Sequence, residues 1–167
     1  MLPEPIISDS YWVTGTLAAG RYPGSKDTRT AAGHIARFEQ SGVTRFVDLT
    51  DEDDRLQPYA HLLQAAQRRE CPIVDMGVPT VEEMLGTLDV IDAAIAEGEV
   101  VYVHCWGGIG RTGTVVGCWL VRHGSRPDDA IGLIRERRID LPVFRRYPDS
   151  PQTAAQARFV HAWEPGT

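Results

Sequence analysis

The chain has 167 residues, of which 43% are hydrophobic and 24% charged, and its formal net charge is −6 at pH 7. This composition is ordinary for a globular protein, and the length predicts one domain, residues 1–167, with a sizeable buried core. The acidic charge argues against general nucleic-acid binding. No apolar run is long enough to cross a bilayer, and three scattered cysteines argue against a disulfide framework, so we expect a cytoplasmic protein.

Hydrophobic periodicity in the first half predicts elements in this order: a helix over 27–41, a strand over 45–49, a helix over about 58–69, and a short apolar strand that ends at Asp75. In the first helix, the spacing of Ala32, Ile35 and Phe38 predicts that these side chains face inward, and Gly42 ends the helix.

In the second half, the predicted elements are a helix over 80–97, a strand over 100–103, a helix that ends near His123, a helix over 127–138, an irregular stretch over 139–151, and a last helix over about 152–163. Helices that separate the strands predict an α/β domain. We expect a central, largely parallel, twisted sheet of about four to five strands, flanked by helices on both faces.

The most informative segment is the glycine-rich turn between the strand over 100–103 and the helix that follows it. Five residues separate Cys105 from Arg111. Backbone N–H groups of such a turn, together with a helix N-terminus, form a site for a phosphate dianion, and the Arg111 guanidinium can clamp two of its oxygens. The same field should hold Cys105 as a nucleophilic thiolate. The predicted phosphate-binding residues are Cys105, Trp106, Gly107, Gly108, Ile109, Gly110 and Arg111.

The segment HCWGGIGRT, which begins at His104, resembles the signature of the cysteine-dependent protein tyrosine and atypical dual-specificity phosphatases, in which HC and five residues precede R and S or T. The resemblance implies a tyrosine-phosphatase-like fold. It also implies that Cys105 attacks a phosphate monoester to form a thiophosphoryl-cysteine, which water then hydrolyses, and that Thr112 hydrogen-bonds the sulfur. No cofactor is implied, and the scattered histidines offer no paired metal ligands.

Asp75 is the candidate general acid. It lies at the end of a predicted strand, thirty residues before Cys105, so both residues would reach the same carboxyl edge of a parallel sheet. Proline follows after three residues, and the stretch resembles the acid loop of the kinase-associated phosphatase and small atypical dual-specificity phosphatases. The other carboxylates considered for this role are interpreted as a solvated acidic loop: Asp51, Asp53 and Asp54.

Gln152 opens a stretch that resembles the glutamine loop and following helix of tyrosine-specific phosphatases and the kinase-associated phosphatase. In that resemblance Gln152 positions the water that attacks the phosphocysteine. Two arginine groups could recognise acidic flanks of a phosphopeptide or a second phosphate, although such runs are more often solvated faces. They are Arg135, Arg137 and Arg138, and Arg145 with Arg146.

The cysteine loop carries no lysine, and Trp106 and Ile109 occupy its variable positions. Phosphoinositide phosphatases of the same fold typically add cationic side chains there. We therefore expect a phosphorylated protein or peptide, with phosphotyrosine favoured and phosphoserine or phosphothreonine as alternatives. Other possibilities are a phosphoinositide, inositol or RNA 5′-phosphatase, a phosphate-binding module without turnover, and a sulfur-transfer enzyme of rhodanese type.

Overall fold

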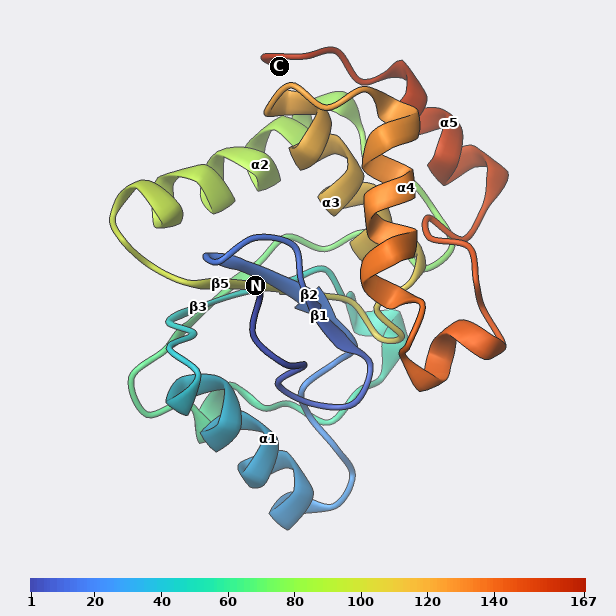
Figure 1. Ribbon diagram of the computed structural model, residues 1–167. Coiled ribbons are helices and arrows are strands. Elements are labelled where there is room, and N and C mark those ends of the chain that lie inside the picture. The colour runs from blue at the N-terminus through green and yellow to red at the C-terminus, as the bar shows by residue number, and fades with distance from the viewer.

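The computed structural model describes all 167 residues, and its centre is a five-stranded sheet with the strand order β1-β2-β5-β3-β4 (Figure 1). The strands are β1 (Ser10–Trp12), β2 (Leu17–Gly20), β3 (Arg45–Asp48), β4 (Gln67–Glu70) and β5 (Val101–His104). β1 runs antiparallel to β2, and the other three neighbouring pairs are parallel. The predicted α/β fold with a largely parallel sheet is confirmed.

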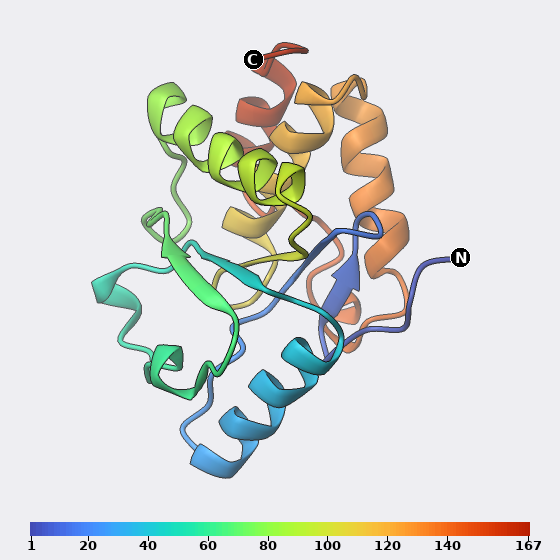
Figure 2. The same cartoon turned by 90° about the vertical axis from the view of Figure 1, so that its left-hand side faces the viewer.

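Helices cover both faces of the sheet, as expected. They are α1 (Thr28–Gln40), α2 (Val81–Ala96), α3 (Gly110–Arg122), α4 (Pro127–Arg138) and α5 (Ala154–Ala162). Figures 1 and 2 show α1 alone on one face, with the other four helices on the opposite face. Each face has its own hydrophobic cluster, of 25 and 12 buried residues. None of the helices has the length and hydrophobicity that a bilayer crossing requires.

β5 is the central strand, and it explains the apolar run that precedes the cysteine loop. Val101 and Val103 join the cluster on the four-helix face, whereas Tyr102 joins the cluster beneath α1, because side chains alternate along a strand. The register pairs His104 with both Gly20 and Asp48, which are the last residues of β2 and β3. The loops that follow these three parallel strands therefore leave the sheet at one edge, where α/β folds place their ligands.

The helix predicted over 58–69 is wrong. This segment contains only a short 3-10 turn, Ala60–Leu62, and ends in the edge strand β4. All four β4 side chains are exposed, so the strand has no apolar alternation that a sequence pattern could detect. In addition, the Glu39 carboxylate on α1 accepts the N–H groups of residues 64–66, each at 2.9 Å, which holds the chain out of a helix. Tertiary pairing overrides local helix propensity here.

Two smaller predictions are also wrong. No strand forms over 71–75, where an apolar strand that ends at Asp75 is expected. β4 ends at Glu70, although Cys71 and Ile73 still donate backbone hydrogen bonds to the chain at the end of β3. In α1, Ile35 and Phe38 are buried as expected, but Ala32 is exposed and Ala31 takes the inward position, because positions 31, 35 and 38 share one face of a helix.

Candidate active site

The cysteine loop connects the end of β5 to the start of α3 and curls around the Cys105 sulfur. Gly108 has φ of 72°, in the left-handed region that favours glycine, and its N–H donates to the Cys105 Sγ at 3.3 Å. A Cβ at Gly108 would overlap the backbone of Gly20 and Arg21. This loop therefore requires glycine at position 108, since it packs directly against the chain that leaves β2.

The loop presents a ring of free backbone donors. No hydrogen bond within the protein uses the N–H groups of Trp106, Gly107, Ile109, Gly110 or Arg111. The helix α3 also begins without a capping side chain. Unpaired N–H groups and the helix dipole both place positive potential at a helix N-terminus, so the surroundings of the sulfur have the electrostatics that favour an anion.

Arg111 lies beneath the loop with its side chain 1% exposed. Its two terminal nitrogens donate to both oxygens of Asp54, at 2.7 and 2.9 Å, and Nη1 also donates to the Ile73 carbonyl at 3.1 Å. Asp75 Oδ1 lies 3.1 Å from Nη2, and Nε has no partner. Burial alone would lower the pKa of Arg111, but hydrogen bonding to Asp54 raises it, so the guanidinium stays charged.

Asp54 is the residue that the sequence prediction missed. Its carboxylate was expected in a solvated loop, yet it is 3% exposed and forms the bidentate pair with Arg111. Burial acts to raise the pKa of Asp54, but the bonds from Arg111 and from the Asp51 N–H lower it below its usual value. The detectable signal was the capping-box spacing of Asp51 and Asp54, which indicates an ordered turn.

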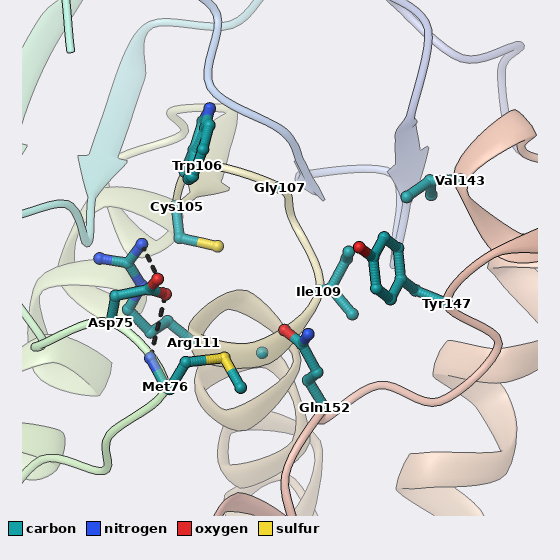
Figure 3. A pocket seen from close by; sticks show the side chains of 11 residues that line it. Asp75, Met76, Cys105, Trp106, Gly107, Ile109, Arg111, Val143, Tyr147 and Gln152 are labelled. Carbon is teal, nitrogen blue, oxygen red and sulfur yellow. Dashed lines mark hydrogen bonds and ion pairs between the residues drawn. The ribbon is translucent and has the colours of Figure 1, made fainter. Parts of the chain in front are cut away.

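All of the candidate residues except Gly108 and Thr112 line one pocket of about 310 Å³ (Figure 3). The Cys105 sulfur points into it, Arg111 and Asp75 lie on one side, and Gln152 and Tyr147 lie on the other. The lining residues are Asp75, Met76, Cys105, Trp106, Gly107, Ile109, Gly110, Arg111, Val143, Tyr147 and Gln152. The irregular stretch over 139–151 thus supplies part of the wall, in addition to the residues expected from the sequence.

Thr112 is not part of the pocket wall. Its side chain is fully buried at the start of α3, and Oγ1 has no hydrogen-bond partner, so the expected bond to the Cys105 sulfur is not formed in this structure. The hydroxyl is therefore an uncommitted donor one residue after the arginine.

Gln156 joins the loops around the pocket, and the sequence prediction did not single it out. Its Oε1 accepts the N–H groups of Gln152 and Thr153, and its Nε2 donates to the Gly77 carbonyl at 3.1 Å. A Cβ at Gly110 would lie 2.9 Å from the Gln156 amide. Gln156 thus fixes the start of α5 against the Asp75 loop and the cysteine loop. Its sequence signal was the capping box formed with Thr153.

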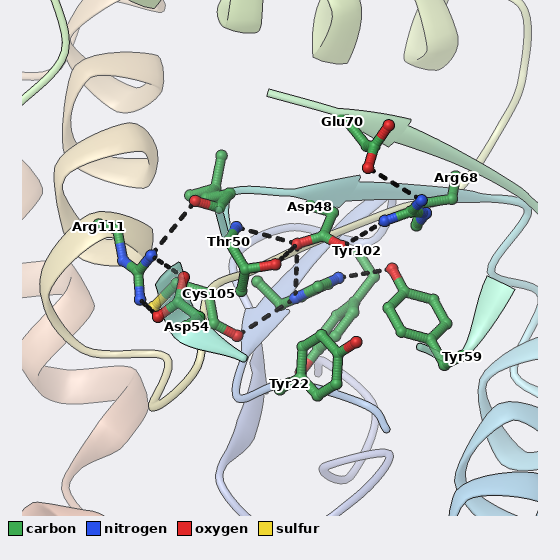
Figure 4. Close-up of polar contacts among 12 residues, drawn as sticks. Tyr22, Asp48, Thr50, Asp54, Tyr59, Arg68, Glu70, Tyr102, Cys105 and Arg111 are labelled. Atoms are coloured by element: carbon green, nitrogen blue, oxygen red, sulfur yellow. Dashed lines mark hydrogen bonds and ion pairs between the residues drawn. The ribbon is translucent and has the colours of Figure 1, made fainter. Parts of the chain in front are cut away.

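His104, at the end of β5, contacts Tyr59 and Asp48, two of the residues labelled in Figure 4. Its Nε2 lies 2.7 Å from the Tyr59 hydroxyl, and its Nδ1 lies 3.3 Å from the Cys105 carbonyl. Burial lowers the pKa of His104 below its usual value, so the ring is neutral at pH 7. Asp48 beneath it is paired with Arg68 at 3.0 Å. His104 contacts the backbone of the loop and does not line the pocket.

The pair between Asp54 and Arg111 should contribute measurably to stability. We expect Asp54→Asn to lower the free energy of unfolding by about 2–3 kcal/mol, because removal of one partner leaves a buried charge undercompensated, while the Ile73 carbonyl and Asp75 still contact the guanidinium. The matched control is Asp53→Asn, which removes an exposed carboxylate from the same turn. It should change the free energy of unfolding by about 0.5 kcal/mol or less. Urea denaturation measures both, and equal effects would contradict the argument.

Comparisons with known proteins agree with this architecture. In solved structures, the chain is similar to Tk-PTP in its active form, with a TM-score of 0.76, 23% identity, and coverage of 93% of this chain and 96% of that one. It is also similar to the kinase-associated phosphatase with its catalytic cysteine replaced by serine, with a TM-score of 0.77, 19% identity, and coverage of 95% and 93%. At these identities the likeness concerns the fold.

At the sequence level, the chain is 28% identical over 159 residues to "Putative tyrosine phosphatase 067L" of Invertebrate iridescent virus 3, which covers 90% of this chain and 63% of the relative. The chain spans between 50% and 63% of the length of three curated relatives. Residues 19–125 match the family model described as "Polymorphic toxin system, DSP-PTPase phosphatase". This match covers more than half of the chain, from β2 to the turn after α3, and the chain therefore belongs to the DSP-PTPase phosphatase family.

Proposed function

We propose that the chain, as one domain over residues 1–167, hydrolyses phosphate monoesters through Cys105 and acts on phosphotyrosine in proteins or peptides. The observation that carries the proposal is the Cys105 sulfur within a ring of unused backbone donors, in one pocket with Arg111 and Asp75. These groups match the needs of phosphoryl transfer, which depends mainly on positioning and on stabilisation of charge.

Arg111 has one edge available for the phosphoryl group. Its Nη1 donates to Asp54 and to the Ile73 carbonyl, and its Nη2 contacts both Asp54 and Asp75, whereas Nε has no partner. A phosphate that takes the Nε and Nη2 edge in bidentate fashion replaces only Asp75. Substrate binding thereby releases the Asp75 carboxyl group toward the leaving oxygen, while Asp54 keeps the guanidinium in place.

The reaction then has two steps. The Cys105 thiolate attacks phosphorus, the P–S bond forms as the ester P–O bond breaks, and the Asp75 carboxyl group gives its proton to the leaving oxygen. In the second step, Asp75 takes a proton from a water that Gln152 positions, and this water attacks phosphorus as the P–S bond breaks. Thr112 is proposed to stabilise the departing sulfur, since its buried hydroxyl has no other partner. Phosphate and the thiolate are released.

The apolar pocket walls support an aromatic phosphoester. Beside the catalytic groups, the pocket is lined by Met76, Trp106, Ile109, Val143 and Tyr147. Such walls favour burial of a phenyl ring, which also contacts aromatic side chains well. A phosphoinositide remains the alternative: PTPMT1, solved in complex with PI(5)P, shares the fold at 20% identity and a TM-score of 0.74.

The proposed location is the cytoplasm. All three cysteines, Cys71, Cys105 and Cys118, carry free thiols. A reducing compartment keeps such thiols from pairing, and a cysteine nucleophile depends on that condition.

Replacement of the nucleophile tests the proposal. Cys105→Ser should reduce hydrolysis of p-nitrophenyl phosphate and of a phosphotyrosine peptide to background, because the serine hydroxyl is not ionised at neutral pH, while the peptide still binds. The control is Cys118→Ala, which should retain activity. Cys118 is also buried, but it lies on α3 and does not line the pocket. A Cys105→Ser enzyme with unchanged turnover would refute the mechanism. Turnover of thiosulfate by the natural protein, without phosphatase activity, would favour the sulfur-transfer alternative.

Leaving-group dependence tests Asp75. Asp75→Ala should lower kcat for phosphotyrosine by about 10²–10⁴-fold, the usual cost of losing a general acid, and should lower kcat much less for 2,4-dinitrophenyl phosphate, whose leaving group needs no proton. Glu82→Gln, an exposed carboxylate at the start of α2, is the control and should behave as the natural protein. An equal loss on both substrates would indicate that Asp75 acts only by holding Arg111.

A further inference from the structure

A second cavity, of about 510 Å³, lies next to the catalytic pocket. The two share Trp106, Gly107 and Val143 as walls, so Trp106, whose side chain is 60% exposed, stands between them. The remaining walls come from the chain after β2 and from the turn that follows Asp54. The lining residues are Asp9, Arg21, Tyr22, Gly24, Ser25, Lys26, Arg55, Leu56, Gln57, Trp106, Gly107 and Val143.

Three cationic side chains line this cavity: Arg21, Lys26 and Arg55. None of them forms an ion pair with a carboxylate of the protein. The one carboxylate in the lining, Asp9, already accepts the Val143 N–H at 2.9 Å. The chain carries a net charge of −6 and Lys26 is its only lysine, so an unpaired cationic group beside the reaction centre is a local departure from an acidic protein.

The cavity walls are fixed by hydrogen bonds to backbone carbonyls, and none of these bonds uses a cationic side chain. The Tyr22 N–H donates to the Trp106 carbonyl at 2.9 Å, which ties this wall to the cysteine loop. The Tyr102 hydroxyl donates to the Arg21 carbonyl at 2.7 Å, and the Tyr22 hydroxyl donates to the Gln57 carbonyl at 2.8 Å. Neutral replacements of the side chains should therefore alter charge while the cavity keeps its shape.

We propose that this cationic cavity binds a second anionic side chain of the peptide substrate, an acidic or phosphorylated residue close in sequence to the phosphotyrosine. The proposal rests on the proposed function and deepens it. Because Trp106 separates the two cavities, the second anion must be several bonds away from the phosphoryl group. Neighbouring residues of an extended peptide, about 3.8 Å apart at Cα, meet that need, and the exposed Trp106 ring can contact the peptide between them.

The test measures binding and turnover separately. Three peptides of one sequence carry phosphotyrosine with neutral neighbours, with glutamate neighbours, or with a second phosphorylated residue. In the Cys105→Ser background, the two anionic peptides should bind about five- to tenfold more tightly than the neutral one. Arg21→Gln with Lys26→Gln should abolish this preference. The control pair, Arg29→Gln with Arg37→Gln, removes the same charge from exposed positions of α1 and should keep it.

In the active enzyme, the Arg21→Gln and Lys26→Gln pair should raise KM for the anionic peptides and leave p-nitrophenyl phosphate unchanged, since that substrate carries no second anion. Equal binding of the three peptides, or a preference that survives the cavity variant, would overturn the inference. Tighter binding of an inositol bisphosphate than of the anionic peptides, lost in the same variant, would overturn it in favour of that ligand. Absence of turnover by the natural protein on every substrate would refute the proposed function instead. The binding comparison would still test the second cavity, because it does not need catalysis.

Discussion

The buried ion pair between Asp54 and Arg111 is the constraint on which the site depends. It joins the turn after β3 to the first residues of α3, and Nη1 of Arg111 also contacts the carbonyl of Ile73 in the chain after β4. Desolvation of a guanidinium is costly, and the bidentate geometry with further acceptors is what offsets that cost. Three loops at one edge of the sheet thereby hold one cation beneath the Cys105 sulfur.

The two carboxylates on Arg111 differ in environment, and the difference assigns them different parts. Asp54 is 3% exposed and engages both terminal nitrogens, whereas Asp75 is 55% exposed and lies near one. An arriving phosphate competes more easily with the solvated contact, because the buried carboxylate would be left without its partner. The exchange of Asp75 for a phosphate would therefore leave the buried pair of Asp54 and Arg111 intact.

Local signals in the sequence predicted the elements that carry the site, and nonlocal pairing explains what they missed. The strand over 100–103, the glycine-rich turn and the buried helix after it follow from apolar runs and glycine spacing, and the structure confirms them. Asp54 was misread because its partner lies 57 residues further along the chain. The β4 strand was misread as a helix because its side chains are all exposed and because Glu39, on α1, holds the preceding backbone.

Trp106, the residue after Cys105, shapes both cavities. Its carbonyl is bonded to the Tyr22 N–H, and its exposed ring forms a wall of both cavities, so a smaller side chain here would merge the two. Although the net charge is −6, exposed carboxylates farther than about 8 Å from a bound anion repel it only weakly, because physiological salt screens charges over that distance. In the second cavity, Arg21, Lys26 and Arg55 form no ion pair, unlike Arg111, and these cations therefore set the local potential there. An acidic protein can in this way select an anion by where its few unpaired cations lie.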